Sequence, residues 1–502
     1  MSTSQSRRTF SQSALAAGAL AGLGDFTFLL GLPAVDGTAS PRTVQLDPDI
    51  EPLVRMIEET SRDKLLEATV NQIRAGVSYQ KLLSAAFLAG VRNIQPRPVG
   101  FEFHCVMAIH SAHQAAQAAA DADRWLALFW ALDNFKESQA IKQKKGAWTM
   151  PALEESKLPR ADQARKAFAS AMDAWDIDGA DRAVAALARS CGANEVFELL
   201  ASYCARDFRA IGHKAIYVAN GCRTLNTIGW RHAEPVLRSI AFALLAYDGT
   251  NPAKSDHDAD RPGRENQERA AKLRTGWQHG KVTPDAAGEQ LAAERTGSYV
   301  EACDQAVELL NREVDPASIW DGIFLSAGEL LMRAPGIVAL HCVTSANALH
   351  YAFQTSGNEG TRKMMLLQAA AFAALFRKAV GRRESDRNQL RIDQLEKADG
   401  ATSVEEIFAN VSKDRPKAAS KALALLAGEG GGAEALLSAG RRLVFNKGRD
   451  SHDYKFSSAA MEDYRNVTPH WRDRYLASSL FWLHGSGDPD NNLMQRARAA
   501  LA

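Results

Sequence analysis

Histidines recur at a fixed spacing along this chain of 502 residues. Four histidines of the first half return about 238 positions later, and short stretches of neighbouring sequence return with them. The paired positions are His104 and His341, His113 and His350, His213 and His452, and His232 and His470. Because a chain of twelve histidines seldom places eight of them in register by chance, the spacing predicts two copies of one structural unit, each supplying imidazoles.

The repeated unit is predicted to be helical. Apolar residues follow helical spacing in many segments, for example at Leu65, Ala68, Val70 and Ile73. Ala and Leu dominate these segments, and both residues favour helix. Sustained alternation of apolar and polar residues, which is typical of strands, does not occur. The sequence therefore predicts an all-α fold of two pseudo-symmetric helical units that arose by internal duplication.

The predicted units can be bounded along the chain. The first helical unit spans residues 48–247 and the second spans residues 297–490. Between them, residues 248–296 contain the polar stretch DHDADRPGRENQERAAKLR, which predicts a charged linker with a helix inside it. Residues 1–40 precede the first unit and are predicted to be a signal peptide with its tail.

The N-terminus matches a twin-arginine export signal. Arg7 and Arg8 stand in the pattern SRRTF, and a mildly apolar stretch follows up to Gly24. That stretch is too short and too rich in glycine to span a membrane, and no later segment is long enough without charge. We therefore expect export to the periplasm by the twin-arginine machinery and no membrane span in the mature chain; the alternative is a disordered basic tail. This route carries folded proteins, often with a cofactor in place.

Charge and cysteine content exclude some classes. The net charge of +1 gives no overall electrostatic case for binding nucleic acid. The six cysteines include no CxxC pair, so they are expected to be free and mostly buried.

Helical geometry limits which histidines can meet. Nine residues along a continuous helix place two side chains about half a turn apart, so only one of His104 and His113 can face a shared site. The same holds for His341 and His350. We favour His104 and His341, because small or hydroxyl residues lie on their face. His113 and His350 are then expected to be core or interface histidines.

Lys455 lies three residues after His452, so the two side chains share one helical face. The equivalent position in the first unit is Ile216, so this lysine belongs to the second unit alone. A lysine beside neutral histidines could form an ion pair, or it could react with carbon dioxide and become an anionic oxygen ligand. The plain alternative is a solvated surface lysine.

Four imidazoles from two equivalent units would form a pseudo-symmetric metal site. Neutral imidazole suits iron, copper, nickel and zinc. The chain has neither the cysteine-rich spacing of structural zinc nor an HExxH motif, and it lacks the CxxCH motif of covalent haem. A haem with paired axial histidines remains an alternative at this point.

The segments GHKAIYV, LHCVTSANALHYA and SHDYKFSSA resemble the questin oxidase-like family. Proteins of that family are helical oxygenases that act on aromatic polyketides of the anthraquinone type. The resemblance implies one non-haem iron (Fe²⁺), dioxygen as co-substrate and a carboxylated lysine. Carried onto this chain, the implied ligands are His104, His213, His341, His452 and Lys455. Tyr217 stands where the family pattern has a second histidine.

Residues near the expected ligands are candidates for supporting the chemistry. Tyr217 and Arg223 are predicted as catalytic groups, and Glu234 and Tyr351 as further candidates. Taken together, these features predict a metal-dependent oxygenase acting on an apolar or aromatic small molecule. The alternatives are a helical protein that binds haem or another cofactor, and a helical-repeat scaffold whose histidines were merely inherited by duplication.

Overall fold

The computed structural model describes residues 42–245, 251–381, 389–428 and 432–501. Residues 43–502 form one compact unit. The predicted export signal at Arg7 and Arg8 lies outside the described residues.

The described chain is helical, which confirms the predicted all-α class. Its extended contacts are two isolated bridges, Thr43 with Pro151 and Lys281 with Val314, and none of the described segments forms a strand. The α-helices are α2 Glu51–Glu59, α3 Leu65–Arg74, α4 Tyr79–Asn93, α5 His104–Met107, α6 Ile109–Gln117, α7 Leu126–Lys145, α8 Ala161–Ala174, α9 Ile177–Ser190, α10 Ala193–Tyr203, α11 His213–Ile228, α12 Ala233–Leu245, α13 Arg261–Ala271, α14 Pro284–Thr296, α15 Tyr299–Asn311, α16 Pro316–Arg333, α17 Ile337–Thr355, α18 Glu359–Val380, α19 Val404–Val411, α20 Arg415–Leu426, α21 Gly432–Lys447, α22 Ser451–Asn466, α23 Arg472–Ser479 and α24 Asn492–Leu501. Short 3₁₀ turns join some of them, at Phe101–Phe103, Asp121–Asp123, Glu155–Lys157, Trp230–His232, Pro252–Lys254 and Ile392–Gln394.

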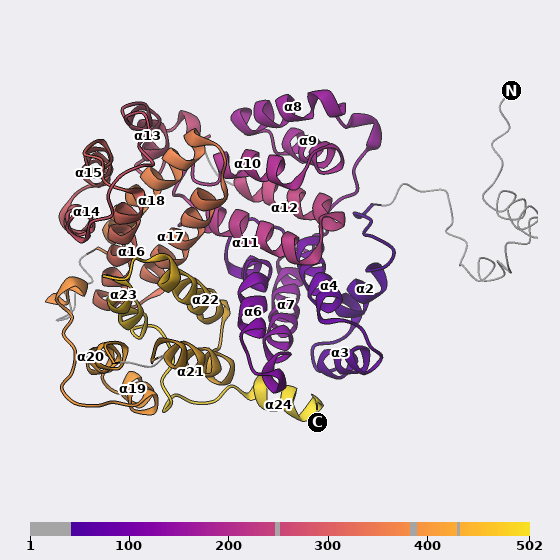
Figure 1. The fold of residues 1–502 in the computed structure, drawn as a ribbon. Coiled ribbons are helices and arrows are strands. Elements are labelled where there is room, and N and C mark those ends of the chain that lie inside the picture. Colours follow the sequence, from indigo (N-terminus) through magenta and orange to yellow (C-terminus); the bar gives the residue numbers. More distant parts are fainter. Residues whose placement is uncertain (1–41, 246–250, 382–388, 429–431, 502) are drawn as a thin grey trace, which may run out of the picture. The chain divides into compact units, whose positions relative to one another are not determined.

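Four helices form the centre of this unit. α6 packs on α11, α11 on α17, α17 on α22, and α22 on α6, so the four contact one another in a ring (Figure 1). α17 is buried along almost its whole length, and its sequence IVALHCVTSANALHYAFQT is largely apolar on every face. A helix that is apolar all round is one that other helices enclose, and this composition places α17 in the core.

The remaining helices cover this centre in groups (Figure 1). α8, α9 and α12 pack together on the N-terminal side, while α13, α15 and α16 pack with α17 or α18. α19, α20 and α21 pack with one another. α20 also packs on α23, and α21 packs on α22. The groups bury an extensive apolar core that runs through both halves of the chain.

The segment predicted as a charged linker contains α13 and α14. One face of α14 is buried in the core. Gln290 and Glu294 of α14 are both fully buried, and the Gln290 amide donates to Oε1 of Glu294 over 2.8 Å. α14 packs on α16. A polar pattern alone could not reveal this, because polar residues that hydrogen-bond to each other can be buried together.

The predicted duplication stays a prediction. The paired histidines do not lie in helices of matching length: His104 begins the four-residue α5, whereas His341 lies inside the nineteen-residue α17. The chain turns at Ala108, between α5 and α6, so the first half lacks the continuous helix of the second.

Two further sequence predictions concern membranes and thiols. Within the described residues, no helix is both long enough and apolar enough to cross a membrane. All six cysteines are free, and five of them are buried, which confirms that prediction.

Candidate metal centre

Helix starts bring four histidines to one place. His213 is the first residue of α11, His452 the second of α22, and His341 the fifth of α17. His104 is the first residue of α5, directly before α6. These segments lie more than a hundred residues apart in sequence, and the central ring of helices brings them together.

Local sequence explains how two of these helices begin. Asp450 caps α22: its carboxylate accepts from the backbone N–H of His452, and Asp453 accepts in return from the backbone of Asp450. This capping box fixes the first turn and therefore the position of His452. Before α11, Gly212 adopts a left-handed φ of 78°, and a Cβ there would lie 1.8 Å from Oγ of Ser345. Glycine is required by both the conformation and the space.

Backbone carbonyls set the tautomer of three of the rings. Nδ1 of His104 lies 2.8 Å from the carbonyl oxygen of Phe101, and Nδ1 of His341 lies 2.7 Å from that of Ile337. Nδ1 of His213 lies 2.7 Å from the carbonyl oxygen of Ala210. A carbonyl can only accept, so each Nδ1 carries the hydrogen. In the neutral rings each Nε2 therefore carries an unprotonated lone pair.

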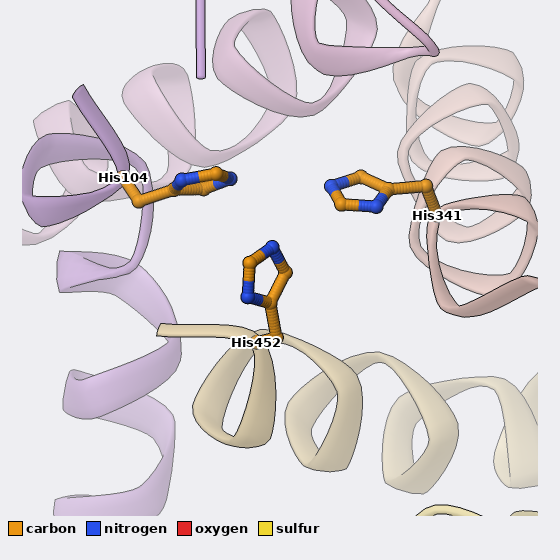
Figure 2. A group of neighbouring side chains, drawn as sticks. All are labelled: His104, His341 and His452. Atoms are coloured by element: carbon orange, nitrogen blue, oxygen red, sulfur yellow. The ribbon is translucent and has the colours of Figure 1, made fainter. Parts of the chain in front are cut away.

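Those lone pairs face one another. Nε2 of His213 lies 2.9 Å from Nε2 of His104 and 2.9 Å from Nε2 of His341. His104, His341 and His452 form a group that could hold a metal ion, since each offers a ring nitrogen within 4.8 Å of the others (Figure 2). His213 is outside that group and joins it through its contacts with His104 and His341. Nδ1 of His452 lies 3.3 Å from Oδ1 of Asp450, but neither ring nitrogen of His452 has a hydrogen-bond partner among the described residues.

Burial keeps these rings neutral. It lowers the pKa of His213 to about 3, and the positive charge of Lys455 adds to that effect. Burial and, to a smaller extent, the positive charge of Lys455 also hold the pKa values of His104 and His341 well below the usual value of histidine. Protons therefore do not bridge the facing nitrogens near neutral pH.

A metal ion fits this arrangement of donors. Bonds of about 2.0–2.1 Å to two imidazoles at a right angle would place the two nitrogens roughly 2.9 Å apart. The contacts of His213 with His104 and His341 have that length. Facing lone pairs repel each other unless a cation lies between them, so the donor set and its spacing both suit a metal.

Lys455 is buried beside the histidines. Only 2% of the residue is exposed, and Nζ has no hydrogen-bond partner among the described residues. Burial lowers its pKa to about 7. The solvated surface lysine that the sequence allowed is therefore wrong, because Lys455 lies on the inward face of α22.

A cavity of about 910 Å³ opens beside the cluster, and all four histidines line it. Its wall also includes Phe101, Ile211, Ile337 and Asp450. The sequence patterns did not identify these four residues as part of the site. A conspicuous signal existed only for Asp450, which follows Gly448 and stands two residues before His452.

The structure does not bring Tyr217 or Arg223 to this cavity. The Tyr217 hydroxyl is fully buried and donates to Oγ of Ser239 over 2.9 Å. Arg223 donates to Oε1 of Glu462 over 2.7 Å and to Oδ1 of Asn347 over 3.1 Å. Both lie further along α11 than His213, among other partners, so the geometry gives neither the predicted catalytic role. Glu234 and Tyr351 do not line the cavity either.

The other repeated histidines also lie away from the cavity. His350 packs edge-on against Trp320 and Phe324, with ring centroids 4.7 Å and 5.1 Å away. Nδ1 of His113 lies 3.4 Å from the hydroxyl of Tyr79. Each residue therefore has the predicted core or interface environment, but the continuous helix assumed for His104 and His113 is interrupted at Ala108.

No protein-family model, curated protein or solved structure matches this chain. The resemblance to the questin oxidase-like family stays a prediction.

Proposed function

We propose that this protein is a metal-dependent oxygenase that uses non-haem iron and acts on an apolar or aromatic small molecule. The observation that carries the metal site is the pair of 2.9 Å contacts between Nε2 lone pairs of His213 and its neighbours, beside a cavity that could admit a substrate. Imidazole donors suit iron, and the family resemblance favours iron over the other metals that bind histidine. Iron held in this way would activate dioxygen.

In this proposal the chain itself performs three tasks. His104, His213, His341 and His452 hold the metal, and the carbonyls of Phe101, Ala210 and Ile337 fix three of their rings by accepting from Nδ1. The cavity holds the substrate beside the cluster. Burial of the donors limits the access of water and keeps the rings ready to bind metal without first losing a proton.

The distances around His213 argue against a haem held between this histidine and either neighbour. Two imidazoles that bind opposite faces of a haem iron lie about 4 Å apart, twice the metal–nitrogen bond length. The contacts of His213 are 2.9 Å, which leaves no room for a porphyrin ring between it and either neighbour.

Metal analysis and an optical spectrum of the purified protein test the proposal. We expect about one iron per chain and no Soret band. His341→Ala together with His452→Ala should abolish metal binding, because it removes two donors from the group. His113→Ala and His350→Ala are matched controls that should retain the metal. Full metal content in the first variant, or a Soret band in the wild type, would contradict the proposed centre.

We further propose that Lys455 carries a carboxyl group. Its uncharged amine can attack carbon dioxide, forming an N–C bond and releasing one proton, and the product is an anionic carbamate. The buried amine without a hydrogen-bond partner supports this, because a carbamate would give the site the oxygen donor it lacks.

Carbon-13 NMR with labelled bicarbonate tests the modification. We expect one protected carbamate signal that disappears in Lys455→Ala. Lys136→Ala is the matched control, because Lys136 is also buried but its amine donates to oxygens of Ile57, Glu58 and Gln139. A spectrum without the signal in the wild type would return Lys455 to the role of an unmodified amine.

Export to the periplasm through the signal at Arg7 and Arg8 is part of the same proposal. An oxygenase that folds and takes up its metal before export would suit the twin-arginine route.

A further inference from the structure

Among the described residues, no carboxylate belongs to the group of side chains that could bind a metal directly. That group consists of histidines alone, and an imidazole binds a metal as the neutral ring. A divalent ion would therefore keep a charge of +2 there, or +1 if Lys455 carries a carbamate. An unbalanced charge inside a protein is costly, so a negatively charged group is needed to balance the charge of the metal.

The carboxylates of the cavity wall do not supply that charge. Oε1 of Glu102 lies 2.5 Å from Nζ of Lys145, and Oε2 of Glu137 lies 3.2 Å from Nη2 of Arg62. Oδ1 of Asp450 lies 3.3 Å from Nδ1 of His452, but this carboxylate also caps α22 and its side chain is 61% exposed, so water screens its charge. Each of these acids is already engaged with other groups.

The surroundings of the cluster favour an anion. α11, α17 and α22 all begin at the cluster, and the N-terminal end of a helix carries partial positive charge. Where Lys455 is not carboxylated, its buried amine, which has no hydrogen-bond partner among the described residues, can also donate to such a ligand. The helix ends and this amine then add to the pull of the metal on a negatively charged ligand.

Two large apolar residues that line the cavity are exposed to solvent. Phe101 is 73% exposed and Ile337 is 43% exposed, and both line the cavity. Val282 is the remaining large hydrophobic residue with high exposure in the described chain, and it lies elsewhere. Phe101 and Ile211 also hold left-handed φ angles of 49° and 42°. Such conformations are costly for these residues and concentrate at ligand sites.

We infer that the cavity binds an organic acid, whose anionic oxygen lies at the histidine cluster and whose apolar body contacts Phe101 and Ile337. The inference rests on the proposed metal centre and narrows its substrate class. The chain supplies neutral histidine donors and apolar contacts in a wall that also includes Arg97, Arg209, Lys214 and Arg449, and the ligand supplies the negative charge.

Cobalt(II) is a suitable probe metal, because its visible absorption bands change when an anion enters its coordination shell. The cobalt-loaded protein would be titrated with naphthoate, with acetate and with the uncharged naphthylmethanol. We expect naphthoate to shift the bands and to bind at least about tenfold more tightly than acetate, because its rings bury apolar surface. Naphthylmethanol should leave the bands unchanged.

Variants locate the apolar contact. Phe101→Ser with Ile337→Ser should weaken naphthoate binding about tenfold and leave acetate binding unchanged. The backbone carbonyls that fix His104 and His341 remain in this variant, and its cobalt content and circular dichroism would verify that the site is intact. Val282→Ser is the matched control for an exposed apolar residue, and it should bind both acids as the wild type does.

The outcomes separate this inference from the metal centre itself. Cobalt binding with equal affinities for naphthoate and acetate would overturn the apolar contact. Cobalt binding with equal affinities for naphthoate and naphthylmethanol would overturn the charge argument, and the metal centre would stand in both cases. A protein that takes up no cobalt would contradict the metal centre and this inference together.

Discussion

Burial determines the chemistry of individual side chains in this protein. Lys455 would carry a full positive charge in water, but in the interior it has no partner to offset the loss of hydration. Burial lowers its pKa from 10.5 to about 7, and the unfolded chain has the higher value. Between those two pH values the unfolded state binds more protons than the folded state, so the stability contributed by this residue rises with pH.

Replacing Lys455 with methionine should therefore stabilise the metal-free protein at pH 7. We expect a gain of a few kcal/mol, which shrinks by roughly 1.4 kcal/mol for each pH unit as the pH rises towards 10.5. Denaturant unfolding of wild type and variant, in buffer free of carbon dioxide, measures the difference at each pH. The histidines whose pKa Lys455 lowers titrate below this pH range, and the other titrating groups are common to both proteins, so their contributions cancel.

Lys136→Met provides a control of opposite sign. The amine of Lys136 donates to three oxygens, so its removal should destabilise the protein by leaving buried acceptors unpaired. If Lys455→Met also destabilised the metal-free protein, or if its effect did not depend on pH, the account of Lys455 as a strained buried amine would fail.

At the scale of elements, the start of α11 is the most constrained part of the site. Ile211 and Gly212 both have left-handed φ angles, and His213 follows them directly. The Phe208 ring packs edge-on against Phe372 and Phe376 of α18, which anchors the approach to this turn. The turn sets the direction in which the His213 ring enters the cluster.

Gly212→Ala should cost both stability and metal. The left-handed conformation alone costs an alanine about 1–2 kcal/mol. The new Cβ would also overlap Oγ of Ser345 at 1.8 Å, which should add roughly 1–3 kcal/mol and move His213. Denaturant unfolding and metal content measure the two effects.

Gly76→Ala separates backbone strain from lack of space. Gly76 has a similar φ of 86°, but a Cβ there would meet nothing within 4 Å. This variant should lose only the stability that the left-handed backbone conformation costs an alanine, and it should keep its metal. Equal losses in the two variants would mean that the contact with Ser345 does not matter.

At the scale of the whole molecule, a buried polar network joins three of the four central helices. Arg223 of α11 donates to Asn347 of α17 and to Glu462 of α22. Asn347 donates in turn to Glu462 and to Asp463 of α22, over 3.0 Å and 2.8 Å. These residues lie six to eleven positions beyond the histidines on the same helices, so the network fixes the ring of helices at a distance from the site.

Arg223→Met tests whether Arg223 is structural. It leaves buried acceptors without a donor, so the free energy of unfolding should fall by roughly 3–5 kcal/mol. Metal content should stay unchanged, because Arg223 does not line the cavity. The exposed Arg160→Met is the control, and it should change stability by less than about 1 kcal/mol. Loss of metal with normal stability in Arg223→Met would instead restore the role at the site that the sequence suggested.

The sequence by itself determined the helical class and the candidate donors. Helical spacing of apolar residues and the wealth of Ala and Leu are local properties, so they predict helices such as α17 without knowledge of the fold. Spacing along a helix also separated His341 from His350, because nine residues fix the angle between two side chains on one continuous helix.

Only the tertiary structure decided what those residues meet. The ring of α6, α11, α17 and α22 joins segments more than a hundred residues apart, and no local pattern encodes that convergence. The same packing buries Lys455, moves Tyr217 and Arg223 away from the cavity, and leaves Phe101 exposed at its mouth. Burial and contact depend on the neighbours that other helices supply, whereas the direction of a side chain on its own helix depends only on its position in the sequence.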